Sequence, residues 1–146
     1  MKQETDSVKD MASHSFEIKG SYHLDNCLPS LNDLLSAAER HPMEYGRMKR
    51  NMEWTIIVAI RRDLKGWKPT GRVTLNITWG EKKKGRKRDY DNIVSAGRKL
   101  INDALVKNGT LKDDSPTYLD YGTNTFVYTD KVFVRVEIVE TEKLAD

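Results

Sequence analysis

The sequence of 146 residues predicts a single domain of the α/β (α+β) class, with helices packed on one small mixed β-sheet. Two segments, 72–79 and 131–140, alternate apolar and polar residues as half-buried strands do. Two others, which begin near residues 43 and 91, repeat apolar residues at helical spacing. A chain of this length is sufficient for one domain with a buried core.

The first strand and a short helix are expected near the start of the domain. Apolar and polar residues alternate from Phe16 to Gly20, which predicts a strand. The segment 28–40 then predicts a short helix, for which Ser30 or Asn32 is the candidate N-cap.

A longer helix is expected to follow Pro42 and to begin near Met43. Its apolar residues recur every four positions, which predicts a buried stripe. The stripe consists of Met48, Met52, Ile56 and Ile60. Methionines at this spacing are more typical of a core than of a cofactor contact.

The second half of the chain predicts a strand, a helix and one or two further strands. The strand over 72–79 places its apolar residues on one face, namely Val73, Leu75, Ile77 and Trp79. A helical pattern follows Asp91 and ends at Gly109. Its apolar face consists of Ile93, Gly97, Leu100 and Ala104. The segment 117–122 predicts a brief strand, and 131–140 predicts the last one.

Composition excludes several classes of protein. No apolar run approaches the length needed to cross a bilayer, and the N-terminus lacks the apolar region of a secretory signal. Residues 1–14 are polar and aperiodic, so we expect a flexible tail there and the domain over 15–146. The single Cys27 cannot form an internal disulfide. We therefore expect a cytoplasmic protein without a membrane partner, in a bacterium or a phage-infected host.

A basic run is the strongest local signal in the chain. Six of the seven residues from 82 to 88 are cationic, although the net charge of the chain is only +3. These candidate DNA-binding residues are Lys82, Lys83, Lys84, Arg86, Lys87 and Arg88. Local basic density attracts nucleic acid phosphates. The alternative is a solvated loop without a ligand.

Two carboxylates follow the basic run directly. On an extended segment Asp89 and Asp91 point to the same side, where a divalent cation would relieve their repulsion. Mg²⁺ commonly uses one or two carboxylates and leaves other positions for water and phosphate. A third carboxylate is available from Asp113 or Asp114. The alternatives are that Asp91 or its neighbour Asn92 caps the helix, and that the later pair forms a turn.

The segment 86–119 contains "RDYDN", then "NDAL", then a glycine, then "DD", in this order. In this it resembles the RusA-like Holliday junction resolvases, which are small phage and prophage endonucleases. The upstream "LPSLND", the helix over 45–61 and the closing "VRVEI" resemble further elements of that family, so the resemblance covers about residues 16–139.

The resemblance implies a RusA-like fold and a metal-dependent endodeoxyribonuclease that resolves four-way junctions by paired cuts, in DNA recombination and repair. Its cofactor would be Mg²⁺, with Mn²⁺ as a substitute. By position, the catalytic and metal-binding acids would be Asp89, Asp91 and Asp114, with Asp113 adjacent to them. The alternative function is a phage accessory protein that binds nucleic acid without catalysis.

One position departs from the family pattern. A lysine is expected four residues after the second acid, where this chain has Ser95. Counting back from Asp103 in "NDAL" reaches Lys99 instead, as if one helical turn were inserted. Lys99 is therefore the candidate catalytic lysine, and Arg98 competes with it.

A symmetric homodimer is expected as the active form. Resolution of a four-way junction requires two cuts, and one chain supplies acids for one site. The apolar contact would come from the stripe of Met48, Met52 and Ile56 or from the last strand. The alternative is a monomer whose stripe is used in its own core.

Overall fold

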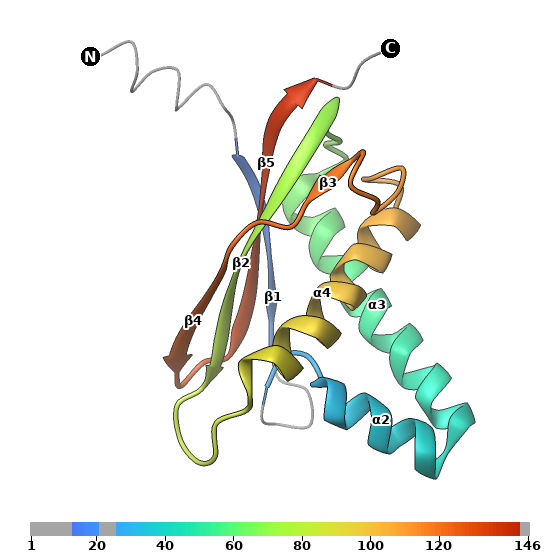
Figure 1. Cartoon of the computed structure of the whole chain (residues 1–146), viewed down its shortest axis with the longest axis vertical. Helices are drawn as coiled ribbons and strands as arrows, with labels where there is room; N and C mark the ends of the chain where they lie inside the picture. Colours follow the sequence, from blue (N-terminus) through green and yellow to red (C-terminus); the bar gives the residue numbers. More distant parts are fainter. Residues whose placement is uncertain (1–12, 21–25, 144–146) are drawn as a thin grey trace.

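The computed structural model describes residues 13–20 and 26–143. It is a single mixed α/β domain in which three helices pack on a five-stranded sheet (Figure 1). The elements in chain order are β1 (Ser13–Lys19), α2 (Leu31–Arg40), α3 (Pro42–Leu64), β2 (Gly71–Lys82), α4 (Tyr90–Lys107), β3 (Leu119–Asp120), β4 (Asn124–Thr129) and β5 (Phe133–Lys143). The predicted fold class is confirmed.

The sheet has mixed strand directions. β5 lies between β1 and β2 and runs antiparallel to both. β3 and β4 pair one after the other with the far side of β2, and both run parallel to it. The last strand of the chain is therefore central, and its residues 133–139 pair with a strand on each side.

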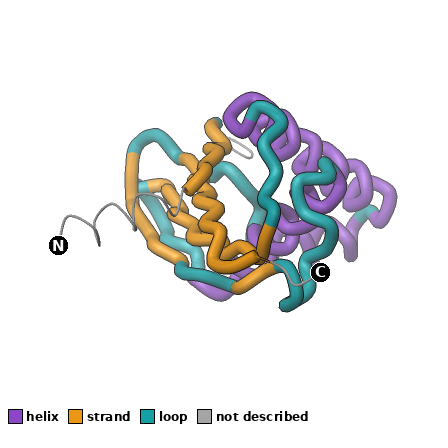
Figure 2. Tube along the Cα trace, turned by 90° about the horizontal axis from the view of Figure 1, so that it is seen from above, coloured by secondary structure: helices purple, strands orange, loops and turns teal. Residues whose placement is uncertain are grey.

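All three helices lie on one side of the sheet, as the view from above shows (Figure 2). The predicted alternation of β2 is confirmed, because Val73, Leu75, Ile77 and Trp79 are at most 1% exposed. Gly97 of α4 lies directly on the Trp79 ring, and a Cβ added to it would lie 2.4 Å from that ring. The close approach explains why this helix contains a glycine in its buried face.

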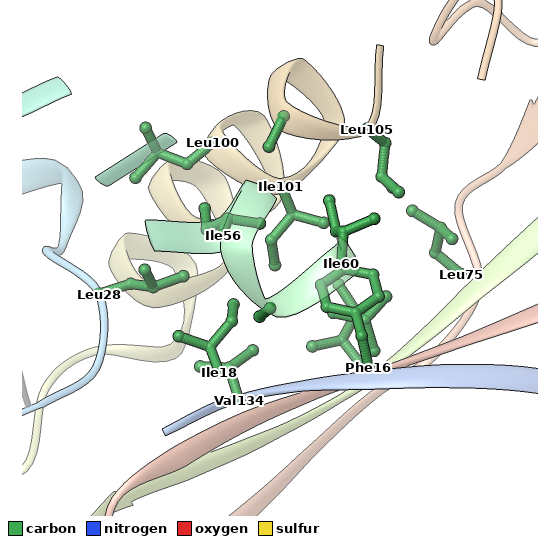
Figure 3. Packing of buried hydrophobic residues seen from close by; sticks show 14 of the residues in the cluster. Phe16, Ile18, Leu28, Ile56, Ile60, Leu75, Leu100, Ile101, Leu105 and Val134 are labelled. Atoms are coloured by element: carbon green, nitrogen blue, oxygen red, sulfur yellow. The ribbon is translucent and has the colours of Figure 1, made fainter. Parts of the chain in front are cut away.

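The core fills the space between this face of the sheet and helices α3 and α4 (Figure 3). Ile56 and Ile60 of α3 are buried there, as predicted. The other two members of the stripe, Met48 and Met52, are only partly buried and line a hollow of about 650 Å³ beside α2. Ile56 is fully buried, so Met48 and Met52 are the members of the stripe that reach the surface.

Local signals explain where the first two helices begin. Ser30 caps α2 in a capping box, since its Oγ accepts from the Asp33 N–H and the Asp33 carboxylate accepts from the Ser30 N–H. Pro42 occupies the first position of α3, where its missing N–H costs no hydrogen bond. Both boundaries were predicted from the sequence.

Two N-terminal features differ from the prediction. β1 begins at Ser13, so Ser13 and His14 belong to the sheet and not to a tail. The His14 ring stacks on Trp67, with 3.7 Å between the ring centroids. The rest of the expected tail, residues 1–12, lies outside the described residues.

The second face of the sheet carries none of the helices that the structure describes. Thr74, Asn76 and Thr78 of β2 point to this side and are half-buried. We call it the open face. In the part of the chain that the structure describes, no helix is both long and apolar enough to cross a membrane.

Candidate metal and nucleic-acid site

The two acids after the basic run lie at the N-terminus of α4. The expectation of an extended segment is wrong here, because the helix begins at Tyr90 and Asp91 is already in its first turn. Asp89 occupies the N-cap position, so neither Asp91 nor Asn92 caps the helix. The Asp89 side chain makes no capping hydrogen bond, and the first-turn N–H groups therefore receive no side-chain cap.

Both carboxylates are exposed. Within the described residues they take part in no hydrogen bond or ion pair, and only their backbone carbonyls have partners. The Asp89 carbonyl accepts from the Ile93 N–H at 3.1 Å, and the Asp91 carbonyl accepts from the Ser95 hydroxyl at 2.7 Å. Ser95, at the position where a lysine was expected, thus bonds to the helix backbone. The two carboxylates are available to a ligand.

The second acidic pair lies beyond the other end of α4. This helix has 18 residues and is therefore about 27 Å long. The N–H groups of Thr110 and Leu111 donate to the Leu105 carbonyl, which ties the following segment to the helix C-terminus. Asp113 and Asp114 come immediately afterwards, and in Figure 1 this segment lies near β3, away from the N-terminus of α4.

Asp114 is consequently separate from the first two acids. Among the described residues, no three His, Cys, Asp or Glu side chains are grouped closely enough to hold a metal ion. The pKa of Lys99 is raised mainly by its hydrogen bond and ion pair with Asp103 and less by the charge of Asp114. The Lys99 ammonium lies 3.2 Å from the Asp103 carboxylate. Sequence reasoning placed these residues in one site, and the single chain does not.

Arg98 has a structural role. Its guanidinium is buried, and the residue is 4% exposed. It donates to the carbonyls of Leu75 at 3.1 Å and Thr123 at 2.8 Å, to the Asn124 side chain at 2.9 Å, and to the Tyr121 carbonyl. Burial lowers the pKa of this guanidinium. Arg98 therefore joins α4 to β2 and to the start of β4, and it is not available as the catalytic cation.

Arg88 differs from the rest of the basic run. Its guanidinium forms a two-pronged ion pair with Glu81, at 2.8 and 2.7 Å, and donates to the Leu28 carbonyl at 2.9 Å. The Glu81 side chain is only 6% exposed and that of Arg88 19%. This pair fixes the end of β2 against the start of α4. We therefore exclude Arg88 from the candidate nucleic-acid surface.

The other cations are arranged along an exposed loop. Lys83, Lys84 and Arg86 are exposed, and within the described residues their charged groups form no ion pair. Lys87 turns back toward the protein, where its ammonium lies 5.2 Å from the centre of the Tyr128 ring and donates to the Lys83 carbonyl. We define residues 83–87 as the basic loop. It connects the tip of β2 to the acids at the start of α4.

Aromatic side chains beside the basic loop were not singled out in the sequence. Tyr90 is 54% exposed and stacks on Phe126 of β4, with 4.1 Å between ring centroids. A hydrogen bond with Tyr90 raises the pKa of Tyr128. The available signal was the aromatic content of "TFVYT" in β4, which lies beside β2 once the sheet forms.

The donor chemistry at the start of α4 fits a divalent cation of the Mg²⁺ type. Asp89 and Asp91 supply hard carboxylate oxygens that no described residue occupies, and Mg²⁺ is commonly held by one or two carboxylates together with water and phosphate. The basic loop beside them attracts phosphate groups. This combination of two open acids and an open cationic loop can bind a phosphodiester next to a metal.

Comparison with known proteins adds no identification. No protein-family model and no curated protein sequence matches this chain.

Proposed function

We propose that this protein is a Mg²⁺-dependent endodeoxyribonuclease that cuts branched DNA, and that four-way junctions are its substrate. The observation that carries the proposal is the pair of exposed carboxylates, Asp89 and Asp91, directly after an exposed cationic loop. Other acids nearby are used in the fold, because Glu81 is paired with Arg88, and the Asp33 carboxylate accepts from the Ser30 N–H in the capping box of α2. An acid pair that the fold does not use, next to phosphate-binding cations, is expected of a metal-dependent phosphodiesterase.

The roles of the residues follow from their positions. Lys83, Lys84 and Arg86 would hold phosphates on either side of the cut, which positions the DNA without reading its sequence. Asp89 and Asp91 would hold Mg²⁺, with Mn²⁺ as a substitute. When bound, the metal supplies Lewis-acid polarisation of the phosphodiester. The uncapped first turn of α4 presents N–H groups that favour a phosphate at the same place.

We further propose that two copies act together as a symmetric dimer, since a four-way junction requires two cuts. The surface that we expect between the copies is the exposed side of α3, where Trp54 is 56% and Val58 45% exposed. This replaces the surfaces suggested by the sequence, because Ile56 is buried in the core and β5 is central in the sheet. A cytoplasmic location is part of the same proposal.

The second candidate is a nucleic-acid-binding protein without catalysis. One observation favours it: Asp114, the third acid implied by the family resemblance, does not join Asp89 and Asp91 in the single chain. A binding protein needs the basic loop but not the acids. The two candidates therefore differ in whether Mg²⁺ produces cleavage.

The experiment is cleavage of a four-way junction labelled on each strand in turn. We expect paired, symmetric cuts in Mg²⁺ and none in EDTA, with much weaker cleavage of a linear duplex of the same sequence. Gel-shift binding without cleavage in either Mg²⁺ or Mn²⁺ would support the binding protein instead.

A further inference from the structure

A hollow of about 790 Å³ lies at the tip of the sheet, where the basic loop meets the turn between β4 and β5. Figure 1 shows that these two connections lie at the same end of the sheet. The strand residues in the wall of the hollow point to the open face of the sheet. Lys19 of β1 is the register partner of Phe133, and Lys82 of β2 is the register partner of Thr129. The hollow is thus on the opposite side of the basic loop from α4. Its volume is within the range of about 300–1,000 Å³ for ligand sites.

Among the described residues, the charged side chains in the wall of the hollow are mostly cationic. They are five lysines, Lys19, Lys82, Lys83, Lys84 and Lys131, and two acids, Glu17 and Asp130. Lys19 is partly neutralised by Glu17, since the two charged groups are 3.8 Å apart. The ammonium groups of Lys83, Lys84 and Lys131 form no ion pair with the described residues, so they attract an anionic ligand.

An aromatic ring lies among these lysines. Phe133 is half-buried, and its ring rests on Gly80 of β2, where an added Cβ would come within 2.3 Å of it. Gly80 is thus the residue that allows the ring to lie on the sheet. Val132 and Gly20 extend the apolar part of the lining. A flat apolar ring with ammonium groups beside it is suited to a ligand that has both a planar ring and a phosphate.

We propose that this hollow, which we call the tip hollow, binds an unpaired nucleotide of a DNA strand, with its base on Phe133 and its phosphates beside Lys83, Lys84 and Lys131. Base stacking on aromatic rings within a cationic groove is the general way of holding single-stranded nucleic acid, and it does not depend on the base sequence. The proposal rests on the proposed function in that DNA is the ligand. It adds a single-stranded segment on the open face, separated from the acids by the basic loop.

The basic loop then has ligands on both sides. Lys83 and Lys84 belong to the wall of the tip hollow, and five residues after Lys84 the chain reaches Asp89. A strand that leaves the hollow and follows these cations arrives at the acids at the start of α4. We therefore infer that the protein holds one unpaired strand near the branch point while the adjoining strand lies at the acids.

The test compares two single-stranded oligothymidylates of equal length and phosphate number, one intact and one with abasic sites in its central part. Their affinities are measured by fluorescence anisotropy in EDTA, where no cutting takes place. We expect the wild-type protein to bind the intact strand at least about fivefold more tightly, as the stacking of one base implies. Phe133→Leu should remove this preference, and Tyr45→Leu, an aromatic control in α3 outside the hollow, should keep it.

Lysine variants test the phosphate contacts. Lys131→Ala should weaken binding of both strands by similar factors, whereas Lys112→Ala, an exposed lysine elsewhere, should weaken neither. Equal affinity of the wild type for the intact and abasic strands would overturn the proposal, and so would a preference that survives in Phe133→Leu. If Phe133→Leu does not fold, the affinities of the wild type for the intact and abasic strands, together with the affinities of Lys131→Ala, still test the proposal.

Failure of this inference is separable from failure of the proposed function. Junction cleavage in Mg²⁺ depends on the acids, and the binding preference in EDTA depends on the tip hollow. Cleavage without a base preference would refute the tip hollow alone, and a base preference without cleavage would refute the nuclease alone.

Discussion

Replacement of Arg88 by alanine should destabilise the fold while it leaves the salt dependence of DNA binding almost unchanged. The substitution leaves the Glu81 carboxylate, 6% exposed, without its two hydrogen bonds, and the Leu28 carbonyl without its donor. Removal of one partner from a buried ion pair costs about 3–5 kcal/mol. Because the Arg88 side chain is 19% exposed, we take the lower limit, about 3 kcal/mol.

For a domain of this size, 1 kcal/mol corresponds to about 2–4 °C in Tm, so the expected decrease is roughly 6–12 °C. Urea unfolding followed by circular dichroism measures the change in the free energy of unfolding. The matched control is Arg86→Ala, which is exposed and should change that free energy by less than about 0.5 kcal/mol. In DNA binding the larger effect should come from Arg86→Ala. This variant alone should reduce the slope of log K against log salt, by about 0.9.

Native stability of Arg88→Ala together with a reduced salt slope would refute this reasoning. It would mean that the guanidinium leaves Glu81 to contact phosphate, and that the pair seen in the structure does not hold the loop in solution.

Three further predictions concern the loop, the thiol and the assembly. Joint replacement of Lys83, Lys84 and Arg86 by alanine should weaken binding to every form of DNA. It should also reduce the slope of log K against log salt by about 0.9 for each phosphate that the variant no longer neutralises. An unchanged slope would mean that the basic loop is solvated and has no ligand. Burial raises the pKa of Cys27 to about 12 from its ordinary value of 9.0, so the thiol should react with a disulfide reagent only after unfolding. Because the pKa of the thiol is higher in the folded protein than in the unfolded chain, the contribution of Cys27 to the free energy of unfolding is complete below pH 9 and is lost as the pH rises toward 12. Cys27→Ala should remove this pH dependence of stability. Light scattering should give twice the chain mass of 16.8 kDa, and Trp54→Lys should give the mass of one chain.

The parts of the fold that were predictable are those that local chemistry determines. The alternation in 72–79 and the capping residue Ser30 each identify their element without reference to distant residues. β4 was missed because Asn124–Thr129 is an edge strand with no fully buried residue, so its apolar alternation is weak. It becomes a strand because it pairs with β2.

The candidate site was predictable only in part, for a related reason. The sequence shows where charges are concentrated but not which of them become buried. Arg88 and Arg98 look like their exposed neighbours in the sequence, yet both are fixed by hydrogen bonds to segments far along the chain. The separation of Asp114 from Asp91 similarly depends on the length and direction of α4, since spacing along the chain does not give a distance in space.

The most direct test of the account is the Asp91→Asn variant on a labelled four-way junction in Mg²⁺. The substitution keeps the size of the side chain and removes one carboxylate charge at the start of α4. We expect cutting to be abolished and gel-shift binding to remain or become tighter, because repulsion of the DNA is reduced. Glu39→Gln, which removes an exposed carboxylate from α2, should cut and bind as the wild type does. Near-normal cutting by Asp91→Asn would contradict the account, because it would remove this acid from the site.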